Sequence, residues 1–324
     1  MATIGNFDGV HLGHQAVLDA LTHRARGAGL PSLVITFEPQ PMEFFCPEQA
    51  PARLTRLREK LEAIACCGID RVLLIRFNAG FAGVDAKAFI REVLVGKLGI
   101  HHLYVGDDFR FGKDRAGDFA LLRSMGRDHG FGVESLDTVA DEGCRISSTR
   151  VREALQEGDL AHAERCLGRR YRICGRVGHG HKRGRTIGFP TMNVALLRRS
   201  TPLRGVFAVQ VLGLADDSLP GVANIGNRPT LSGDHRFLLE VHLSIFPTRY
   251  TVGMSRSISS SASVTSTSSS HSTHCANRSG EMYSVQEKSI AWMIWSTDNP
   301  ADAPARGAMA IHSTEFFLLP SLSP

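Results

Sequence analysis

Two kinds of apolar pattern alternate through the first half of the chain. Compact apolar runs predict buried strands at residues 32–37, 71–77, 102–105 and 132–136. Apolar residues spaced three or four apart predict helices over residues 15–21, 55–67, 85–98 and 119–129. Strands that alternate with helices in this way are typical of a parallel sheet with helices on both faces. In such sheets, ligands bind beyond the carboxyl ends of the strands.

The pattern changes in the second half of the chain. A helical stretch over residues 148–167 closes the first domain. Short strands separated by glycine- and proline-containing turns follow it, at residues 171–177, 206–212, 221–225 and 237–246. In the last of these, Phe237, Leu239 and Val241 alternate with polar residues, which is a period of two. This pattern predicts a small antiparallel barrel or sandwich.

The last part of the chain has a different composition. Serine dominates residues 255–272, and residues 275–324 show no clear periodicity. Such segments bury too little apolar surface to offset the entropy lost on ordering. We therefore predict three regions: an α/β domain over 1–167, an incomplete barrel over 168–246, and a serine-rich, mostly disordered tail over 247–324.

Composition narrows the class of protein. Apolar residues make up 43% and charged residues 21% of the 324 residues, which is typical of soluble globular proteins. No apolar run of about 18 residues predicts a membrane span. The seven cysteines include no C-x-x-C pair, which favours reduced thiols and a cytoplasmic location. The net charge of +5 suits anionic small substrates, and no nucleic-acid-binding motif accompanies it.

The stretch Gly5–His14 is the first candidate for chemistry. It follows a short apolar run and leads into a helical pattern, so its glycines fall at a strand-to-helix turn. The free N–H groups and partial positive charge of a helix N-terminus suit phosphate. His11 and His14 are three residues apart and share one face of this helix start. Two imidazoles there are suited to hold a triphosphate and to stabilise charge during attack on it.

Two further stretches of the first domain have candidate ligand-binding residues. Val105–Gly112 places Asp108 beside Phe109 at a strand end, where a flavin ring can be stacked and hydrogen-bonded. Ile146–Arg152 begins a helix with three hydroxyl residues, which leave side-chain and backbone donors for phosphate. An arginine one turn into that helix can bind a phosphate with two hydrogen bonds.

The predicted barrel begins with a basic, glycine-rich stretch, Gly175–Asn193. Its glycines leave backbone amides free to surround an anion, and Lys182 and Arg185 add positive charge. Thr191 and Asn193 offer two oxygen ligands on one face of a strand, which suits Mg²⁺ that bridges phosphates. A solvated basic hairpin is the simpler alternative for this stretch.

These stretches together resemble one family. Gly5–His14 is similar to the HxGH signature of nucleotidylyltransferases, and in its full length to the adenylyltransferase half of bacterial bifunctional riboflavin kinase/FAD synthetases. Val105–Gly112 resembles the G-x-D/N-F-x-F-G loop of that family, and Ile146–Arg152 resembles its I-S-S-T-x-x-R element. The run Gly188–Asn193 is similar to the G-F-P-T-x-N core of riboflavin kinases. The resemblance covers about residues 2–246.

The resemblance implies two reactions in FAD biosynthesis. A Rossmann-like nucleotidylyltransferase domain would transfer AMP from ATP to FMN, giving FAD and pyrophosphate. A riboflavin kinase-like barrel would phosphorylate riboflavin to FMN with ATP and Mg²⁺. The expected partners are therefore small molecules, with no nucleic acid and no membrane.

The resemblance also assigns roles to individual residues. The catalytic residues of the first domain would be His11, His14 and Arg152. Its ATP- and phosphate-binding residues would be Gly5, Asn6, Phe7, Asp8, Gly9, Gly13, Ser147, Ser148 and Thr149. Its flavin-binding residues would be Asp108 and Phe109. The ATP-binding residues of the barrel would be Gly178, Gly180, Lys182, Gly184, Arg185, Gly188 and Pro190, with Thr191 and Asn193 as metal ligands.

The sequence departs from the family pattern after Phe246. Riboflavin kinases continue with a further strand, a closing helix and a glutamate that acts as base, and no stretch beyond Phe246 matches that pattern. An abrupt change to serine-rich sequence is typical of a shifted reading frame. We therefore expect an impaired kinase and an open barrel edge. The short first strand, with Met1 almost at the motif, is a second departure.

Two other functions fit parts of this pattern. The HxGH signature is shared by adenylyltransferases that act on other phosphorylated acceptors, although the barrel stretch argues against that assignment. A non-catalytic flavin- or nucleotide-binding module would use the same glycine-rich turn with two incidental histidines. Alanine substitution of the histidines separates catalysis from binding.

Overall fold

The computed structural model describes residues 1–135, 139–178, 191–196, 198–212, 214, 218–228, 236–243, 261–266 and 291–295. The strands of the first domain are β1 (Ala2–Ile4), β2 (Leu33–Glu38), β3 (Arg71–Arg76), β4 (His102–Val105), β5 (Gly132–Ser135), β6 (Ala140–Asp141) and β7 (Cys144–Arg145). Its helices are α1 (Leu12–Gly27), α2 (Pro41–Phe45), α3 (Leu57–Cys66), α4 (Ala79–Ala82), α5 (Ala86–Ala88), η1 (Phe89–Lys97), η2 (Lys113–Arg115), α6 (Phe119–His129), α7 (Ser148–Glu157) and α8 (Leu160–Leu167).

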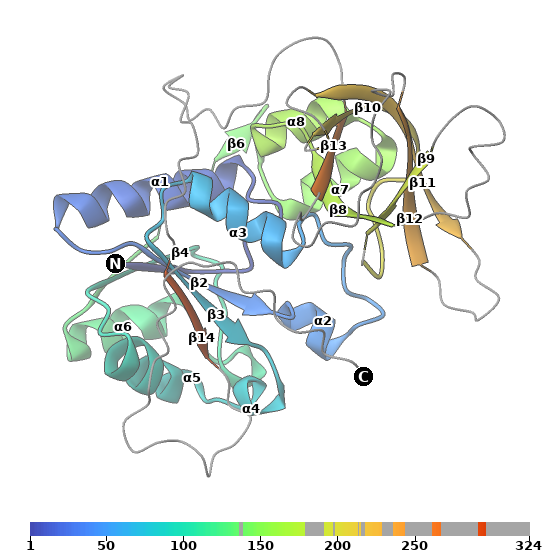
Figure 1. Ribbon diagram of the computed structural model, residues 1–324. Helices are drawn as coiled ribbons and strands as arrows, with labels where there is room; N and C mark the ends of the chain where they lie inside the picture. Colours follow the sequence, from blue (N-terminus) through green and yellow to red (C-terminus); the bar gives the residue numbers. More distant parts are fainter. Residues whose placement is uncertain are drawn as a thin grey trace.

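The first domain is built on a parallel sheet with helices on both faces, as the sequence predicts. The strand order is β14-β3-β2-β1-β4-β5, where β14 is Ala291–Trp295. Helices α1 and α3 cover one face of the sheet, and α4, α5 and α6 cover the other (Figure 1). Val34, Val72 and Tyr104 pack towards α1 and α3, whereas Ile35 and Leu73 pack on the opposite face. Alternate side chains of each strand therefore belong to separate cores.

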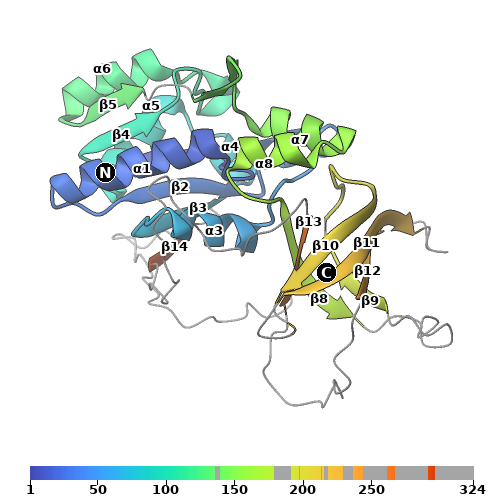
Figure 2. The same ribbon diagram turned by 90° about the horizontal axis from the view of Figure 1, so that it is seen from above.

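The second domain is an antiparallel barrel. Its strands are β8 (Arg172–Gly178), β9 (Thr191–Ala195), β10 (Gly205–Leu212), β11 (Leu219–Arg228), β12 (Arg236–Leu243) and β13 (Ser261–Ser266). The ring runs in the order β10-β11-β12-β9-β8-β13 and closes where β13 pairs with β10. Figure 2 shows α7 and α8 between this barrel and the sheet. No helix among the described residues is long and apolar enough to cross a membrane.

Several elements differ from the sequence-based predictions. The helix predicted over 85–98 consists of the short helix α5 and the π-helix η1. The helix predicted over 148–167 is two helices, because Gly158 takes a left-handed φ of 78° and ends α7. The predicted irregular tail contributes two strands: β14 extends the first sheet beside β3, and β13 lies at the barrel edge that we expected to be open. Strands β13 and β14 pair through their backbone groups. The N–H and C=O groups of an unpaired strand edge can bind any extended segment in this way. The rest of 247–324 lies outside the described residues.

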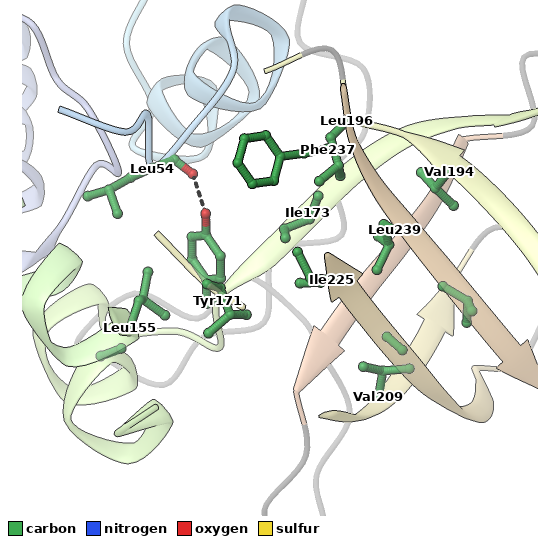
Figure 3. Close-up of a cluster of buried hydrophobic side chains, with 14 of the residues drawn as sticks. Leu54, Leu155, Tyr171, Ile173, Val194, Leu196, Val209, Ile225, Phe237 and Leu239 are labelled. Carbon is green, nitrogen blue, oxygen red and sulfur yellow. Dashed lines mark hydrogen bonds between the residues drawn. The ribbon is translucent and has the colours of Figure 1, made fainter. Parts of the chain in front are cut away.

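A buried polar network joins the two domains. The Tyr171 hydroxyl donates to the Leu54 carbonyl at 3.1 Å and lies in a continuous apolar core with Leu155 and Ile173 (Figure 3). The Arg198 guanidinium donates to Glu59 Oε2 at 2.6 Å and to the Tyr171 hydroxyl at 3.0 Å. The side chains of Arg198 and Glu59 are 2% and 8% exposed, so this ion pair is shielded from water. Helix α3 is therefore tied to the barrel by an ion pair and not by apolar contact alone.

Removing one partner of this ion pair should destabilise the protein. Arg198→Met leaves the Glu59 carboxylate buried without its charged partner, and such losses cost about 3–5 kcal/mol. Denaturant unfolding of the full chain measures this change. Glu62→Gln breaks the exposed Arg58–Glu62 pair on the same helix, where both side chains are about half exposed, and should cost less than about 1 kcal/mol. Equal effects of the two substitutions would contradict this ranking.

Candidate active sites

The loop between β1 and α1 has an unusual backbone. Phe7 and Val10 have positive φ values of 48° and 41°, and Gly9 lies between them at 82°. Glycine adopts this region freely, whereas a β-branched valine does so at a cost of about 1–3 kcal/mol. Such conformations persist only where the surroundings hold them. The contacts around this loop are therefore part of the site.

Asp8 holds the loop from one side. Its carboxylate accepts hydrogen bonds from the backbone amides of Leu54 and Thr55, both at 3.0 Å. It also forms an ion pair with the Arg152 guanidinium. The carboxylate is 3% exposed. The Ser148 hydroxyl donates to the Asp8 carbonyl at 2.9 Å, which ties the start of α7 to the same loop. Asp8 thus anchors the loop and does not face solvent.

Arg169 holds the loop from the side of the domain junction. Its guanidinium donates to the carbonyls of Gly9 at 2.6 Å, Val10 at 2.9 Å and Leu167 at 3.2 Å. The Gln15 amide donates to the Val10 and Leu167 carbonyls, both at 2.8 Å. The strained residues are therefore bound to the end of α8, just before the barrel begins.

The two histidines lie immediately after the strained loop. His11 is the N-cap of α1, and its Nδ1 accepts a hydrogen bond from the His14 amide at 3.3 Å. The two rings stack with centroids 3.7 Å apart. Burial lowers the pKa of His11 to about 4, and burial also holds the pKa of His14 well below its usual value. Both imidazoles are therefore neutral near pH 7 and act through hydrogen bonds until a ligand changes their surroundings.

A cleft of about 500 Å³ opens beside the histidines at the carboxyl ends of β1 and β4. The predicted site residues that line it are Gly5, Phe7, His11, Gly13, His14, Asp108, Phe109, Ser147, Ser148 and Thr149. A Cβ atom at position 13 would lie 3.2 Å from the His11 ring, so any other residue there would require the ring or the backbone to shift slightly. Three stretches that are far apart in the sequence thus meet in one cleft.

Four predicted residues do not line this cleft: Asn6, Asp8, Gly9 and Arg152. Arg152 was expected to bind phosphate, but it donates to Asp8 and, at 2.7 Å, to the Ala52 carbonyl. Arg145 lines the cleft instead and forms an ion pair with Asp108 at 3.2 Å. The sequence analysis did not identify Arg145, although this residue directly precedes the candidate stretch Ile146–Arg152.

The predicted metal ligands of the barrel lie together on β9. The Asn193 Oδ1 atom is buried and has no hydrogen-bond partner among the described residues, and Thr191 Oγ1 lies 3.0 Å from His242 Nδ1. Glu240 on β12 is the register partner of Asn193, so both side chains lie on the same face of the sheet. Gly178 ends β8, and the other predicted ATP-binding residues lie outside the described residues: Gly180, Lys182, Gly184, Arg185, Gly188 and Pro190.

Known proteins match both domains. A family model for FAD synthetase matches residues 1–150, and one for riboflavin kinase matches residues 167–284. The chain is 56% identical over 241 residues to the bifunctional riboflavin kinase/FMN adenylyltransferase of Escherichia coli (strain K12), covering 74% of this chain and 77% of that protein. The chain belongs to the bifunctional riboflavin kinase/FMN adenylyltransferase family. The Pseudomonas fluorescens member is 54% identical over 246 residues, covering 76% of this chain and 78% of that protein.

The match to the riboflavin kinase model continues past Phe246, to residue 284, whereas the matches to the two bifunctional relatives span 241 and 246 residues, the length that the sequence predicts. It includes β13, the strand that closes the barrel. The fold is also similar to the crystal structure of a macrolide-efflux protein from Streptococcus pneumoniae, with a TM-score of 0.67 and 27% identity over 82% of this chain and 84% of that one. Membership of the bifunctional riboflavin kinase/FMN adenylyltransferase family therefore accounts for both domains.

Proposed function

We propose that this chain makes FAD from riboflavin in two steps, one in each domain. The barrel transfers the γ-phosphoryl group of ATP to the 5′-hydroxyl of riboflavin, giving FMN. The first domain then transfers AMP from a second ATP to FMN, giving FAD and pyrophosphate. The assignment of adenylyl transfer to the first domain rests on one observation. The two histidines, the N-terminus of helix α7 and the Asp108–Phe109 loop line the same cleft.

Adenylyl transfer needs positioning and charge stabilisation more than covalent chemistry. The FMN phosphate is itself the nucleophile and attacks the α-phosphorus in line with the departing pyrophosphate. His11 and His14, at the start of α1, donate hydrogen bonds to the phosphates as negative charge builds. The Ser147 and Thr149 hydroxyls and the free amides at the start of α7 bind the pyrophosphate.

The flavin end of FMN enters the cleft near β4. The Phe109 ring stacks on Phe111, with centroids 5.5 Å apart, and offers an aromatic wall for the flavin ring system. Arg145 sits at the cleft beside this wall, paired with the exposed Asp108 carboxylate. A bound phosphate can replace that carboxylate as the partner of Arg145. We therefore assign Arg145 to phosphate binding in place of Arg152.

The kinase step uses the polar face of the barrel formed by β9 and β12. Asn193 Oδ1 and the Thr191 hydroxyl would hold Mg²⁺, because oxygen ligands suit this ion and Asn193 Oδ1 has no hydrogen-bond partner among the described residues. When bound, the ion neutralises charge on the phosphates of ATP. Glu240 lies opposite Asn193 and takes the proton of the riboflavin 5′-hydroxyl as general base. This assignment replaces the expected base beyond Phe246 and removes the main reason to expect an impaired kinase.

A two-substrate assay on the purified full chain tests this function. One reaction contains riboflavin and the other contains FMN, both with ATP and Mg²⁺, and chromatography resolves the flavins. We expect FAD from FMN, and FMN followed by FAD from riboflavin. Product from FMN alone would restrict the chain to adenylyl transfer. Absence of product from both, with flavin binding retained, would favour the non-catalytic binding module.

Arg169 should position the catalytic loop for this reaction. Arg169→Met removes the hydrogen bonds to the Gly9 and Val10 carbonyls, so the strained loop relaxes and His11 moves. A displacement of about 1 Å can cost about 100-fold in rate. We therefore expect kcat for FMN adenylylation to fall about 10- to 100-fold, with a smaller change in KM for FMN.

A neighbouring arginine provides the control for this prediction. Arg170 lies 3.8 Å from Glu164, so Arg170→Met should keep nearly the wild-type kcat. Arg169→Lys restores one charged donor and should recover part of the rate. A lower unfolding midpoint in Arg169→Met with unchanged kcat would show that Arg169 stabilises the fold without positioning the histidines.

A further inference from the structure

Three potential metal ligands meet behind the β6–β7 hairpin, outside the two sites described above. Asp141 is the last residue of β6, and His162 and Cys166 lie one turn apart on the same face of α8. One ligand atom from each lies within 4.8 Å of the other two. Ligands four residues apart on a helix, completed by a third from a neighbouring loop, are a common way to build a metal site.

The ligand atoms are buried, and two of them are unsatisfied. Asp141 Oδ2 and His162 Nε2 are inaccessible to solvent and have no hydrogen-bond partner among the described residues, and Cys166 is fully buried. A buried polar atom without a partner costs free energy that a bound ion can recover. His162 Nε2 therefore lacks a hydrogen-bond partner among the described residues, and Asp141 Oδ2 has only two arginines nearby at ion-pair distance.

The surrounding charges permit a divalent cation. Arg150 and Arg165 lie near Asp141 Oδ2, at 3.9 and 3.7 Å, which are too long for hydrogen bonds. Arg165 also lies 3.7 Å from Glu142, so it can stay paired when an ion occupies Asp141. Arg150 keeps its hydrogen bonds to the Asp141 and Cys144 carbonyls at 2.9 and 3.0 Å. Cys166 would bind the ion as a thiolate, which adds one negative charge beside the two arginines.

The mixed ligand set selects the class of ion. Magnesium and calcium take oxygen ligands, whereas thiolate together with imidazole and carboxylate suits zinc and its neighbours. We propose that Asp141, His162 and Cys166 form a binding site for a zinc-class divalent ion, with a fourth position open to water.

An ion at this site would fix the hairpin that leads to the cleft. Strand β7 pairs with β6 and ends at Arg145, which lines the adenylylation cleft. Binding at Asp141 joins this hairpin to α8 by metal–ligand bonds. The ion therefore provides a structural link between α8 and a residue of the active site.

Cobalt titration of the reduced, full-length protein without substrates tests the proposal. Co²⁺ reports thiolate ligation by a charge-transfer absorption band, and added Zn²⁺ should remove it by competition. Cys166→Ser should abolish the band, whereas Cys144→Ser, which changes an exposed thiol on the same hairpin, should keep it. No band in the wild-type protein, or a band that survives in Cys166→Ser, would overturn the proposal.

A second variant decides the result if Cys166→Ser does not fold. His162→Leu changes a half-buried side chain and leaves the core cysteine in place. Because changes around metal ligands alone cost about 10- to 100-fold in affinity, loss of a direct ligand should weaken Co²⁺ binding at least about tenfold. Unchanged affinity in His162→Leu would overturn the proposal. These outcomes do not depend on flavin chemistry, so they stand apart from the proposed function.

Discussion

Replacing His11 or His14 with alanine should lower the rate of FMN adenylylation by about two to three orders of magnitude. Both imidazoles line the cleft and lie at the N-terminus of α1, where they can stabilise charge on the α- and β-phosphates of ATP. Their hydrogen bonds strengthen as charge develops, so kcat should fall more than the affinity for FMN. Steady-state kinetics together with a flavin-binding titration measure both quantities.

The same helix supplies a control for the histidine variants. His23 lies near the other end of α1 and is exposed, so His23→Ala should keep the wild-type rate. Riboflavin phosphorylation by the His14→Ala protein provides an internal control, because that reaction takes place in the barrel. If His11→Ala and His14→Ala both retained most of the adenylylation rate, the cleft would not be the catalytic site.

Replacing Glu240 with glutamine should lower riboflavin phosphorylation by about 10²- to 10⁴-fold, which is the usual contribution of a general base. Glutamine keeps the shape of the side chain but cannot accept the proton of the flavin hydroxyl. FMN adenylylation by the same protein should stay at the wild-type rate. Separate assays with riboflavin and with FMN, on one preparation, measure both effects.

The metal dependence distinguishes Glu240 from its neighbour Asn193. Asn193→Ala removes a proposed Mg²⁺ ligand, so it should raise the Mg²⁺ concentration needed for half-maximal phosphorylation. Glu240→Gln should instead lower the rate at saturating Mg²⁺ without changing that concentration. Phosphorylation within about twofold of wild type in Glu240→Gln would contradict this assignment and place the base elsewhere.

Local patterns predicted most of the secondary structure of both domains. The strand predicted at 102–105 and the helix at 119–129 have the observed bounds. These elements are predicted by residues close together in the sequence. Runs of apolar side chains indicate the strands, and apolar residues three or four apart indicate the helices. Strands β13 and β14 were not predicted, because their pairing depends on unpaired edges formed by distant strands.

The sequence by itself also indicated the two activities, because the glycine-rich turn with the His11–His14 pair, the hydroxyl-rich helix start and the run Gly188–Asn193 are local motifs. Tertiary structure alone showed which neighbouring side chains lie in the cleft. Arg152 was expected at the phosphates but is paired with the buried Asp8, while Arg145 lines the cleft. Glu240 became a candidate only when β12 paired with β9 and brought it opposite Asn193. A motif specifies its own backbone, whereas burial and strand register depend on residues far away in the sequence.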